Sequence, residues 1–409
     1  MSELVLKDLF GRYRQRYIYD PTYERAVPLV GATKLWLVVP VYDEDLTGLT
    51  NSLAECSGPT KEATLLLVFN NPENSPLRQK HKEQAAYWHG QQLANGIKVY
   101  ALAALGLPEK HAGVGLARKI GMDAALAAFA GSNYDGLIVC LDADCGVSVN
   151  YLTELLRAEQ AGIRGASLYF EHQLEDLAGA EQQRIINYEV WLRYYVQCLR
   201  RIGYWHAFHT VGSSMAVRAS TYARIGGMNR RKAGEDFYFL HKLIPHGRFY
   251  DLTTTTVYPS ARESARVPFG TGRAMMEMEA GTKDFSRVYA PEIFHQIKPL
   301  ISDPDYALYN PGEALPRPLQ HALSDLGWVG EMQSLIRRSA NPESLKTNFK
   351  YWLDGFRMLK LVHWLRDNCY GEIDSLEACN NVLNINTKNH VDLIKALREL
   401  DRNSPFDYF

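Results

Sequence analysis

Several features are missing from this chain of 409 residues, and each absence argues against a class of protein. No apolar run approaches the ~20 residues that span a bilayer, and the first residues form no apolar signal-peptide core. The six cysteines include no Cys-x-x-Cys pair, which indicates reduced thiols in a cytoplasmic protein and no zinc site. A formal net charge of −1 provides no basic field for nucleic acid or an anionic membrane.

The composition that remains is that of an ordinary globular protein. Hydrophobic residues make up 46% of the chain and charged residues 22%, proportions typical of a folded soluble protein. The chain is too long for one small domain, so its length suggests one large α/β domain with an addition.

Short apolar segments alternate with helical segments through the first 170 residues. The apolar segments read as strands, and they cover Leu35–Val41, Thr64–Phe69, Ile97–Ala101, Gly136–Leu141 and Arg164–Phe170. Helical stretches lie between them, and the clearest is the alanine-rich stretch 114–130, whose small residues suggest close packing against a sheet. Strands separated by helices of this length predict βαβ units and a mostly parallel twisted sheet flanked by helices.

The pattern changes after residue 180. Glu181–Arg201 reads as a long amphipathic helix, and residues 248–252 and 254–258 read as two β-rich pieces. Prolines cluster between residues 285 and 318, and the chain beyond them is mostly helical. The predicted domains are therefore a lead-in segment (1–33), an α/β domain (34–285) and a mainly helical C-terminal region (286–409).

The most informative stretch is Asp142-Ala-Asp144, which follows the apolar strand 136–141. Acids at the carboxyl end of a buried strand lie at the edge where open α/β sheets bind ligands. Two such acids repel each other, and a hard divalent cation shared with substrate phosphates relieves the repulsion. Loop acids that cap a helix give the same pattern, so the motif gains weight from Gly234-Glu-Asp236, about ninety residues later.

These motifs together resemble the family 2 glycosyltransferases, which have the GT-A fold. The matching segments are Val38-Val-Pro-Val-Tyr-Asp-Glu44, Gly113-Val-Gly-Leu-Ala-Arg-Lys-Ile-Gly121, Asp142-Ala-Asp144, Gly212-Ser-Ser-Met-Ala-Val-Arg218 and Gly234-Glu-Asp236. They are specific for the fold and for sugar-nucleotide chemistry, and they do not identify the sugar or the acceptor. Residues 285–409 carry no motif of this resemblance.

The resemblance implies that the loops after the first two strands hold the nucleotide. Backbone groups of Pro40 and Val41 and the Glu44 carboxylate would contact base and ribose, although acids here also suit a helix N-terminus. Asn70 stands where the family commonly has an aspartate that reads the base. An amide can pair with a uracil or a guanine edge, so the base stays open.

Two further groups follow from the resemblance to the donor site. Arg118 would approach the donor pyrophosphate, where a fixed cation offsets developing charge; an exposed helical arginine is the alternative. Asp144 would bind Mn²⁺ or Mg²⁺ directly, and Asp142 would touch the ribose or a metal-bound water. His206 and His209 are weaker candidates for a third ligand.

Glu235 and Asp236 open a predicted helix. By the resemblance, Asp236 is the base that deprotonates the acceptor hydroxyl, and Glu235 supports it or positions the acceptor. Proton removal by a positioned carboxylate contributes ~10²–10⁴-fold in rate. A pair of helix-capping acids is the alternative.

The segment 260–273 carries three arginines on a loop interrupted by glycine and proline. Arg266 and Arg273 are the members that we expect to grip the diphosphate or a phosphorylated acceptor. Surface ion pairs are the alternative, and such pairs contribute little.

The sequence and the resemblance together predict a cytoplasmic, metal-dependent glycosyltransferase that moves a sugar from a UDP- or GDP-sugar to an acceptor hydroxyl. Inversion at the sugar carbon is what the resemblance implies. The acceptor stays open between a glycan, a lipid-linked sugar and a small molecule, and a lipid-linked sugar would bring peripheral contact with a membrane. Two alternatives remain: a catalytically idle sugar-nucleotide-binding or scaffold protein, and a nucleotidyltransferase. The second lacks support because no glycine-rich phosphate loop follows the first strand.

Overall fold

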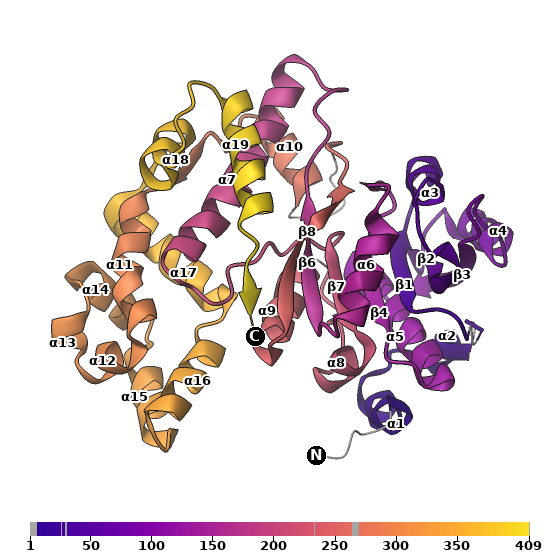
Figure 1. Ribbon diagram of the computed structural model, residues 1–409, viewed down its shortest axis with the longest axis horizontal. Helices are drawn as coiled ribbons and strands as arrows, with labels where there is room; N and C mark the ends of the chain where they lie inside the picture. Colours follow the sequence, from indigo (N-terminus) through magenta and orange to yellow (C-terminus); the bar gives the residue numbers. More distant parts are fainter. Residues whose placement is uncertain (1–5, 26, 29–30, 233, 264–269, 409) are drawn as a thin grey trace. The chain divides into compact units, whose positions relative to one another are not determined.

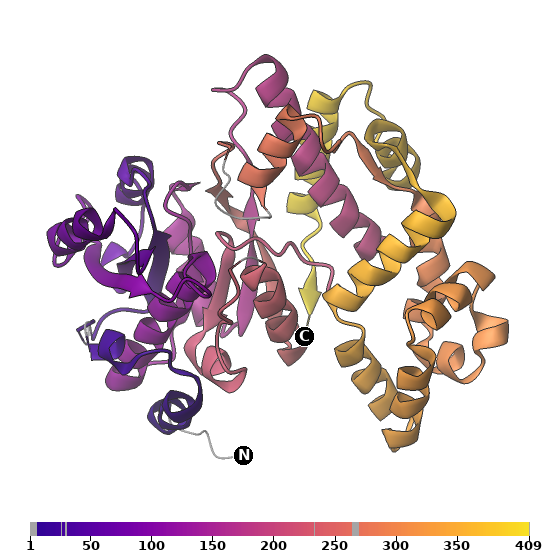
Figure 2. The ribbon, with the colours of Figure 1, turned by 180° about the vertical axis from the view of Figure 1, so that it is seen from behind.

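The computed structural model describes residues 6–25, 27–28, 31–232, 234–263 and 270–408. They divide into two compact units, drawn in Figure 1 and, from behind, in Figure 2. The first unit comprises Met1–Gln173 and Thr210–Arg273, and the second comprises Leu174–His209 and Ala274–Tyr408. The division thus differs from the predicted boundaries, because helix α7 (Gly179–Arg201) packs on C-terminal helices of the second unit.

The first unit is built on one mostly parallel sheet. Its strands are β1 (Leu35–Val41), β2 (Ala63–Pro72), β3 (Lys98–Leu107), β4 (Leu137–Cys140), β5 (Gly146–Val147), β6 (Gly165–Phe170), β7 (Met215–Arg218) and β8 (Phe249–Tyr258). Their order is β8-β6-β7-β4-β1-β2-β3, and β5 pairs with β8. The pairs β1–β2, β1–β4, β2–β3 and β6–β8 are parallel, whereas β7 is antiparallel to both of its neighbours. The prediction of a mostly parallel α/β sheet is confirmed.

Helices cover the sheet. Those of the first unit are α1 (Leu6–Tyr17), α2 (Pro21–Arg25), α3 (Thr47–Ala54), α4 (Arg78–Trp88), α5 (Val114–Ser132), α6 (Tyr151–Gln160), α8 (Ala219–Arg224) and α9 (Glu235–Leu243), with short 3-10 turns at Thr60–Glu62 and Ile244–His246. Every residue of β1, β4 and β6 is buried, as expected for parallel strands covered on both faces. Helix α10 (Thr271–Glu279) contains the boundary between the units.

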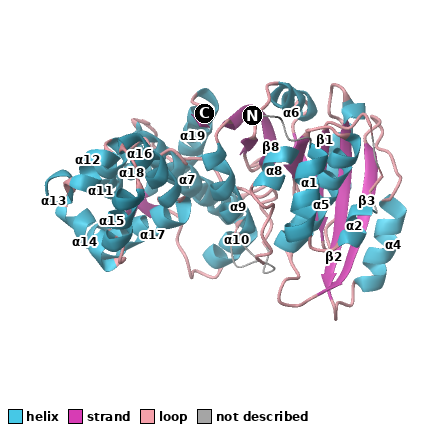
Figure 3. Ribbon diagram, turned by 90° about the horizontal axis from the view of Figure 1, so that it is seen from below, coloured by secondary structure: helices cyan, strands magenta, loops and turns pink. Residues whose placement is uncertain are grey.

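Helix α5 lies alongside β1 and β2, as Figure 3 shows. Gly121 allows this close approach, because a Cβ there would lie 2.5 Å from Val38 Cγ1 and 2.8 Å from Val68 Cγ2. The close packing expected from the small residues of this helix is confirmed. Helix α1 packs in turn on α5 and α8.

The second unit is mainly helical, as predicted for the C-terminal region. Besides α7 it contains α11 (Pro291–Ser302), α12 (Pro304–Tyr309), α13 (Pro311–Ala314), α14 (Arg317–Asp325), α15 (Val329–Arg338), α16 (Pro342–Trp352), α17 (Gly355–Leu365), a π-helical turn (Arg366–Tyr370), α18 (Ser375–Leu383) and α19 (His390–Asn403), with β9 (Arg287–Tyr289) antiparallel to β10 (Glu372–Asp374) and the short strand β11 (Asp407–Tyr408). The clustered prolines mostly open these helices, where proline is favoured because its missing N–H has no intrahelical partner.

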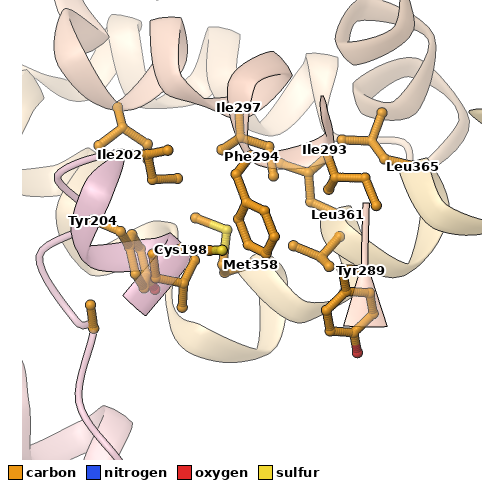
Figure 4. Close-up of a cluster of buried hydrophobic side chains, with 14 of the residues drawn as sticks. Cys198, Ile202, Tyr204, Tyr289, Ile293, Phe294, Ile297, Met358, Leu361 and Leu365 are labelled. Atoms are coloured by element: carbon orange, nitrogen blue, oxygen red, sulfur yellow. The ribbon is translucent and has the colours of Figure 1, made fainter. Parts of the chain in front are cut away.

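The core of the second unit joins distant segments. Figure 4 shows Cys198 of α7 and Ile202, which follows this helix, beside Ile297 and Phe294 of α11 and Met358 of α17, all buried. In the part of the chain that the structure describes, no helix combines the length and the apolar character that a membrane crossing requires.

Candidate functional site

The ends of two neighbouring strands bring the predicted acids to one edge of the sheet. Strands β1 and β4 are parallel and adjacent, with Val38 opposite Cys140. The chain therefore leaves both strands at the same edge, toward Glu44 after β1 and toward Asp142 and Asp144 after β4. This edge is where open α/β sheets bind ligands.

Arg118 of α5 is the centre of the site. Only 1% of the residue is exposed. Its Nη2 donates to Asp142 Oδ1 at 2.5 Å, and its Nη1 donates to Glu235 Oε1. A buried guanidinium must be paired to be tolerated, so Arg118 ties the acids after β4 to those that open α9.

Glycines allow α5 and α9 to come this close. A Cβ at Gly115 would lie 2.1 Å from the Arg231 carbonyl oxygen and 3.0 Å from Glu235 Cβ. A Cβ at Gly212 would lie 2.9 Å from Arg118 Nη1 and 3.0 Å from Asp236 Oδ2. Gly115 and Gly212, which belong to two of the matching motifs, are therefore required by close approach.

Asp236 also lies beside Arg118, but it is less buried than Glu235. Glu235 is 3% exposed, whereas Asp236 is half-buried. The backbone N–H of Phe237 donates to Asp236 Oδ1 at 2.7 Å, and Gly212 supplies a further backbone hydrogen bond. The structure thus places a half-buried acid next to a fully buried one that Arg118 holds.

Burial raises the pKa of each of these carboxyls, and Arg118 only partly opposes that effect. The pKa of Glu235 is raised to about 7, with Asp236 adding to the increase. Burial likewise raises the pKa of Asp142 and of Asp236 against the lowering effect of Arg118. Three acids around one cation therefore hold protons more tightly than free carboxyls do.

Asp144, the second acid of the Asp142-Ala-Asp144 motif, pairs with Arg262 and not with Arg118. Arg262 Nε donates to Asp144 Oδ2 at 2.6 Å, and Arg262 Nη2 donates to Glu44 Oε1 at 3.3 Å. The backbone N–H groups of Tyr42 and Asp43 donate to Glu44 Oε2. Arg262 was included in the arginine-rich loop, but the sequence favoured Arg266 and Arg273 over it.

The remaining predicted nucleotide residues are at the strand ends. Pro40 and Val41 are buried at the end of β1. Asn70 is 5% exposed, and its amide donates to the Val41 carbonyl at 2.9 Å, so this side chain fixes the chain leaving β1. Arg273 lies half-buried in α10. Arg266 lies outside the described residues.

Other partners surround Lys119, which follows Arg118, and the two weaker candidates for a metal ligand, His206 and His209. Lys119 is buried and pairs with Asp123 at 2.9 Å and with the Tyr13 hydroxyl at 3.0 Å. His206 and His209 belong to the second unit, where His209 Nε2 lies 3.1 Å from Asp401 Oδ2. The structure thus assigns these histidines to the second unit, whereas the acids of the site belong to the first.

The acids of this edge suit a divalent cation by charge and by chemistry. Five carboxylates, those of Glu44, Asp142, Asp144, Glu235 and Asp236, face two guanidinium groups. The side chains of Asp142 and Asp144 are 40% and 30% exposed. Among the described residues no three His, Cys, Asp or Glu side chains group around one point, so a cation here would take its other ligands from water and substrate oxygens.

Comparison with known proteins adds weak likenesses. No family model and no curated protein matches this chain. S. aureus TarS 1-349 in complex with UDP-GlcNAc shares 14% identity at a TM-score of 0.40, with 82% of this chain and 90% of that chain covered. The same fragment in complex with UDP shares 13% identity at a TM-score of 0.40, covering 85% and 95%. Likenesses of this size carry no conclusion about the family or activity of this chain.

Proposed function

We propose that this chain is a glycosyltransferase of the GT-A type that transfers a sugar from a nucleotide-diphosphate sugar to an acceptor hydroxyl. One observation carries the proposal: the buried guanidinium of Arg118 joins Asp142 to Glu235. The acids suited to a cation and the acids suited to proton transfer therefore lie at one edge of one sheet.

Asp236 is the proposed base. It is half-buried beside Glu235, and a base must reach the proton that it removes. Asp236 takes the proton of the acceptor hydroxyl as that oxygen bonds to the anomeric carbon. The bond from this carbon to the diphosphate oxygen breaks, and the nucleoside diphosphate leaves with the electron pair. A single displacement of this kind inverts the anomeric carbon.

Glu235 and Arg118 position the reacting groups. Glu235 is almost fully buried and accepts from Arg118, so it fixes the start of α9 and thereby the direction of Asp236. Arg118 fixes Asp142 in the same way. Asp142 and Asp144 would hold Mn²⁺ or Mg²⁺, which would supply positive charge against the leaving diphosphate.

The donor is a UDP- or GDP-sugar in this proposal, and the acceptor is a glycan, a lipid-linked sugar or a small molecule. Glu44 and the backbone of Pro40 and Val41 at the end of β1 are the proposed nucleoside contacts. Asn70 supports them through its bond to the Val41 carbonyl.

The test is release of free nucleoside diphosphate from UDP- or GDP-sugars in the presence of Mn²⁺. We expect turnover in the wild type, a loss of at least ~10²-fold with Asp236→Asn, and a comparable loss with Asp144→Asn. Glu343→Gln is the matched control, since this side chain is 85% exposed in α16. Donor binding without turnover in every variant and in the wild type would instead identify a sugar-nucleotide-binding protein.

A further inference from the structure

The loop that leaves β8 begins beside the acid pair. Strand β5, two residues after Asp144, pairs with the end of β8, with Gly146 opposite Tyr258. The chain then continues to Arg262, whose backbone N–H donates to Ser260 Oγ at 3.2 Å. Arg262 is thus delivered to Asp144 by the pairing of these two strands.

Arg262 bridges two carboxylates that arrive from different strands. Its guanidinium lies 2.6 Å from Asp144 Oδ2 and 3.3 Å from Glu44 Oε1. Glu44 is held in place by two backbone N–H groups, and its side chain is only 11% exposed. The Arg262 guanidinium therefore places a positive charge against Asp144, where the proposed divalent cation would also bind.

The two arginines of the site differ in how easily they can be replaced. The Arg118 side chain is 2% exposed, whereas 42% of the Arg262 side chain is exposed. A buried charge pair cannot lose one partner without a large cost, but an exposed pair can exchange with solvent ions because its net contribution is small. Of the two, Arg262 is therefore the exchangeable counterion.

We propose that Arg262 is an internal counterion of Asp144 and Glu44 that competes with the divalent cation for Asp144. This inference rests on the proposed function, because it assumes that Asp144 ligates a cation there. Arg262 neutralises the two acids in the protein without cation, and it must leave Asp144 when the cation binds. Its presence therefore weakens cation binding.

The test measures Mn²⁺ binding to the full chain by titration calorimetry and by the electron paramagnetic resonance signal of free Mn²⁺, without donor. We expect Arg262→Gln to lower the Kd for Mn²⁺ by about two- to fivefold, the range that an exposed ion pair represents. The Mn²⁺-induced rise in Tm should grow correspondingly. Arg262→Lys keeps the charge and should bind Mn²⁺ more weakly than Arg262→Gln.

Two controls make the result specific. Arg157→Gln removes an arginine whose side chain is 68% exposed and pairs with Glu154 in α6, and it should leave the Kd unchanged. The double variant Asp144→Asn with Arg262→Gln should lose the tighter Mn²⁺ binding that Arg262→Gln alone shows. An equal or higher Kd in Arg262→Gln would overturn the counterion role while leaving the proposed function standing. Absence of Mn²⁺ binding in all variants would overturn both the counterion role and metal dependence.

Discussion

At the scale of single residues, Arg118 has partners that the sequence did not suggest. It was expected to approach the donor diphosphate, yet its guanidinium is buried against Asp142 and Glu235. The motif identified the residue, but the partner could not be read from it, because Glu235 is 117 residues away. Arg262 was undervalued for the same reason, since only the β5–β8 pairing brings it to Asp144.

Removing the Arg118 charge should destabilise the fold as well as the site. Arg118→Met leaves Glu235 buried without its cation, so we expect the free energy of unfolding at pH 7 to fall by ~3–5 kcal/mol. Urea unfolding measures this. The double variant Arg118→Met with Glu235→Gln should regain part of the loss, and Arg157→Met should change stability by less than ~1 kcal/mol. An unchanged midpoint in Arg118→Met would contradict the paired burial.

The raised pKa of Glu235 predicts a pH dependence of stability. Its pKa is near 4.5 in the unfolded chain and about 7 in the folded one, so the folded state binds more protons between these values. The resulting stability is fully present below pH 4.5 and is lost as the pH rises through 7. Unfolding at pH 5 and pH 8 should therefore show wild type losing stability relative to Glu235→Gln, which has no proton to release. A difference in unfolding free energy between wild type and Glu235→Gln that is the same at pH 5 and pH 8 would contradict the raised pKa of Glu235.

At the scale of elements, the sequence predicted those strands and helices whose residue patterns are local. Strand β1 has the predicted bounds, and β4 and α5 agree within two residues, because an apolar run and an alanine-rich helix are visible in the sequence alone. The pieces 248–252 and 254–258 form one strand, β8, which pairs with β6 and, at its end, with β5. Helix α7 was assigned to the α/β domain because nothing local shows that its partners lie near residue 400.

The contact of α5 with the sheet depends on a missing side chain. Gly121→Ala would put a methyl group 2.5 Å from Val38 Cγ1, and overpacking of this kind costs ~1–3 kcal/mol. We therefore expect Gly121→Ala to lower the urea midpoint, although alanine favours helices. Gly11→Ala in α1 is the matched control, because no atom lies within 4 Å of its added Cβ. It should stabilise the protein by up to ~1 kcal/mol, and a similar gain at Gly121 would contradict the close packing.

At the scale of the whole molecule, the chain passes between the two units at 173/174, 209/210 and 273/274. The second unit has its own buried charge network, in which Asp401 of α19 accepts from Arg193 and Gln197 of α7 and lies beside His209. Burial alone would raise the pKa of Asp401, but Arg193 and His209 more than offset it and hold this pKa well below its usual range. Each unit therefore has a core and a paired buried arginine of its own.

This organisation predicts that substitutions in the two units act on separate unfolding transitions. Asp401→Asn leaves Arg193 paired with Glu189, a counter-charge that Arg398 also shares. We therefore expect it to lower the stability of the second unit by up to ~3–5 kcal/mol. Gly121→Ala should lower only the transition of the first unit. Scanning calorimetry resolves the two, with Asp392→Asn as the control on α19, since Asp392 is exposed. If both variants instead shift one common transition alike, the two units unfold as one. Substitutions confined to separate cores can move a common transition only if those cores melt together.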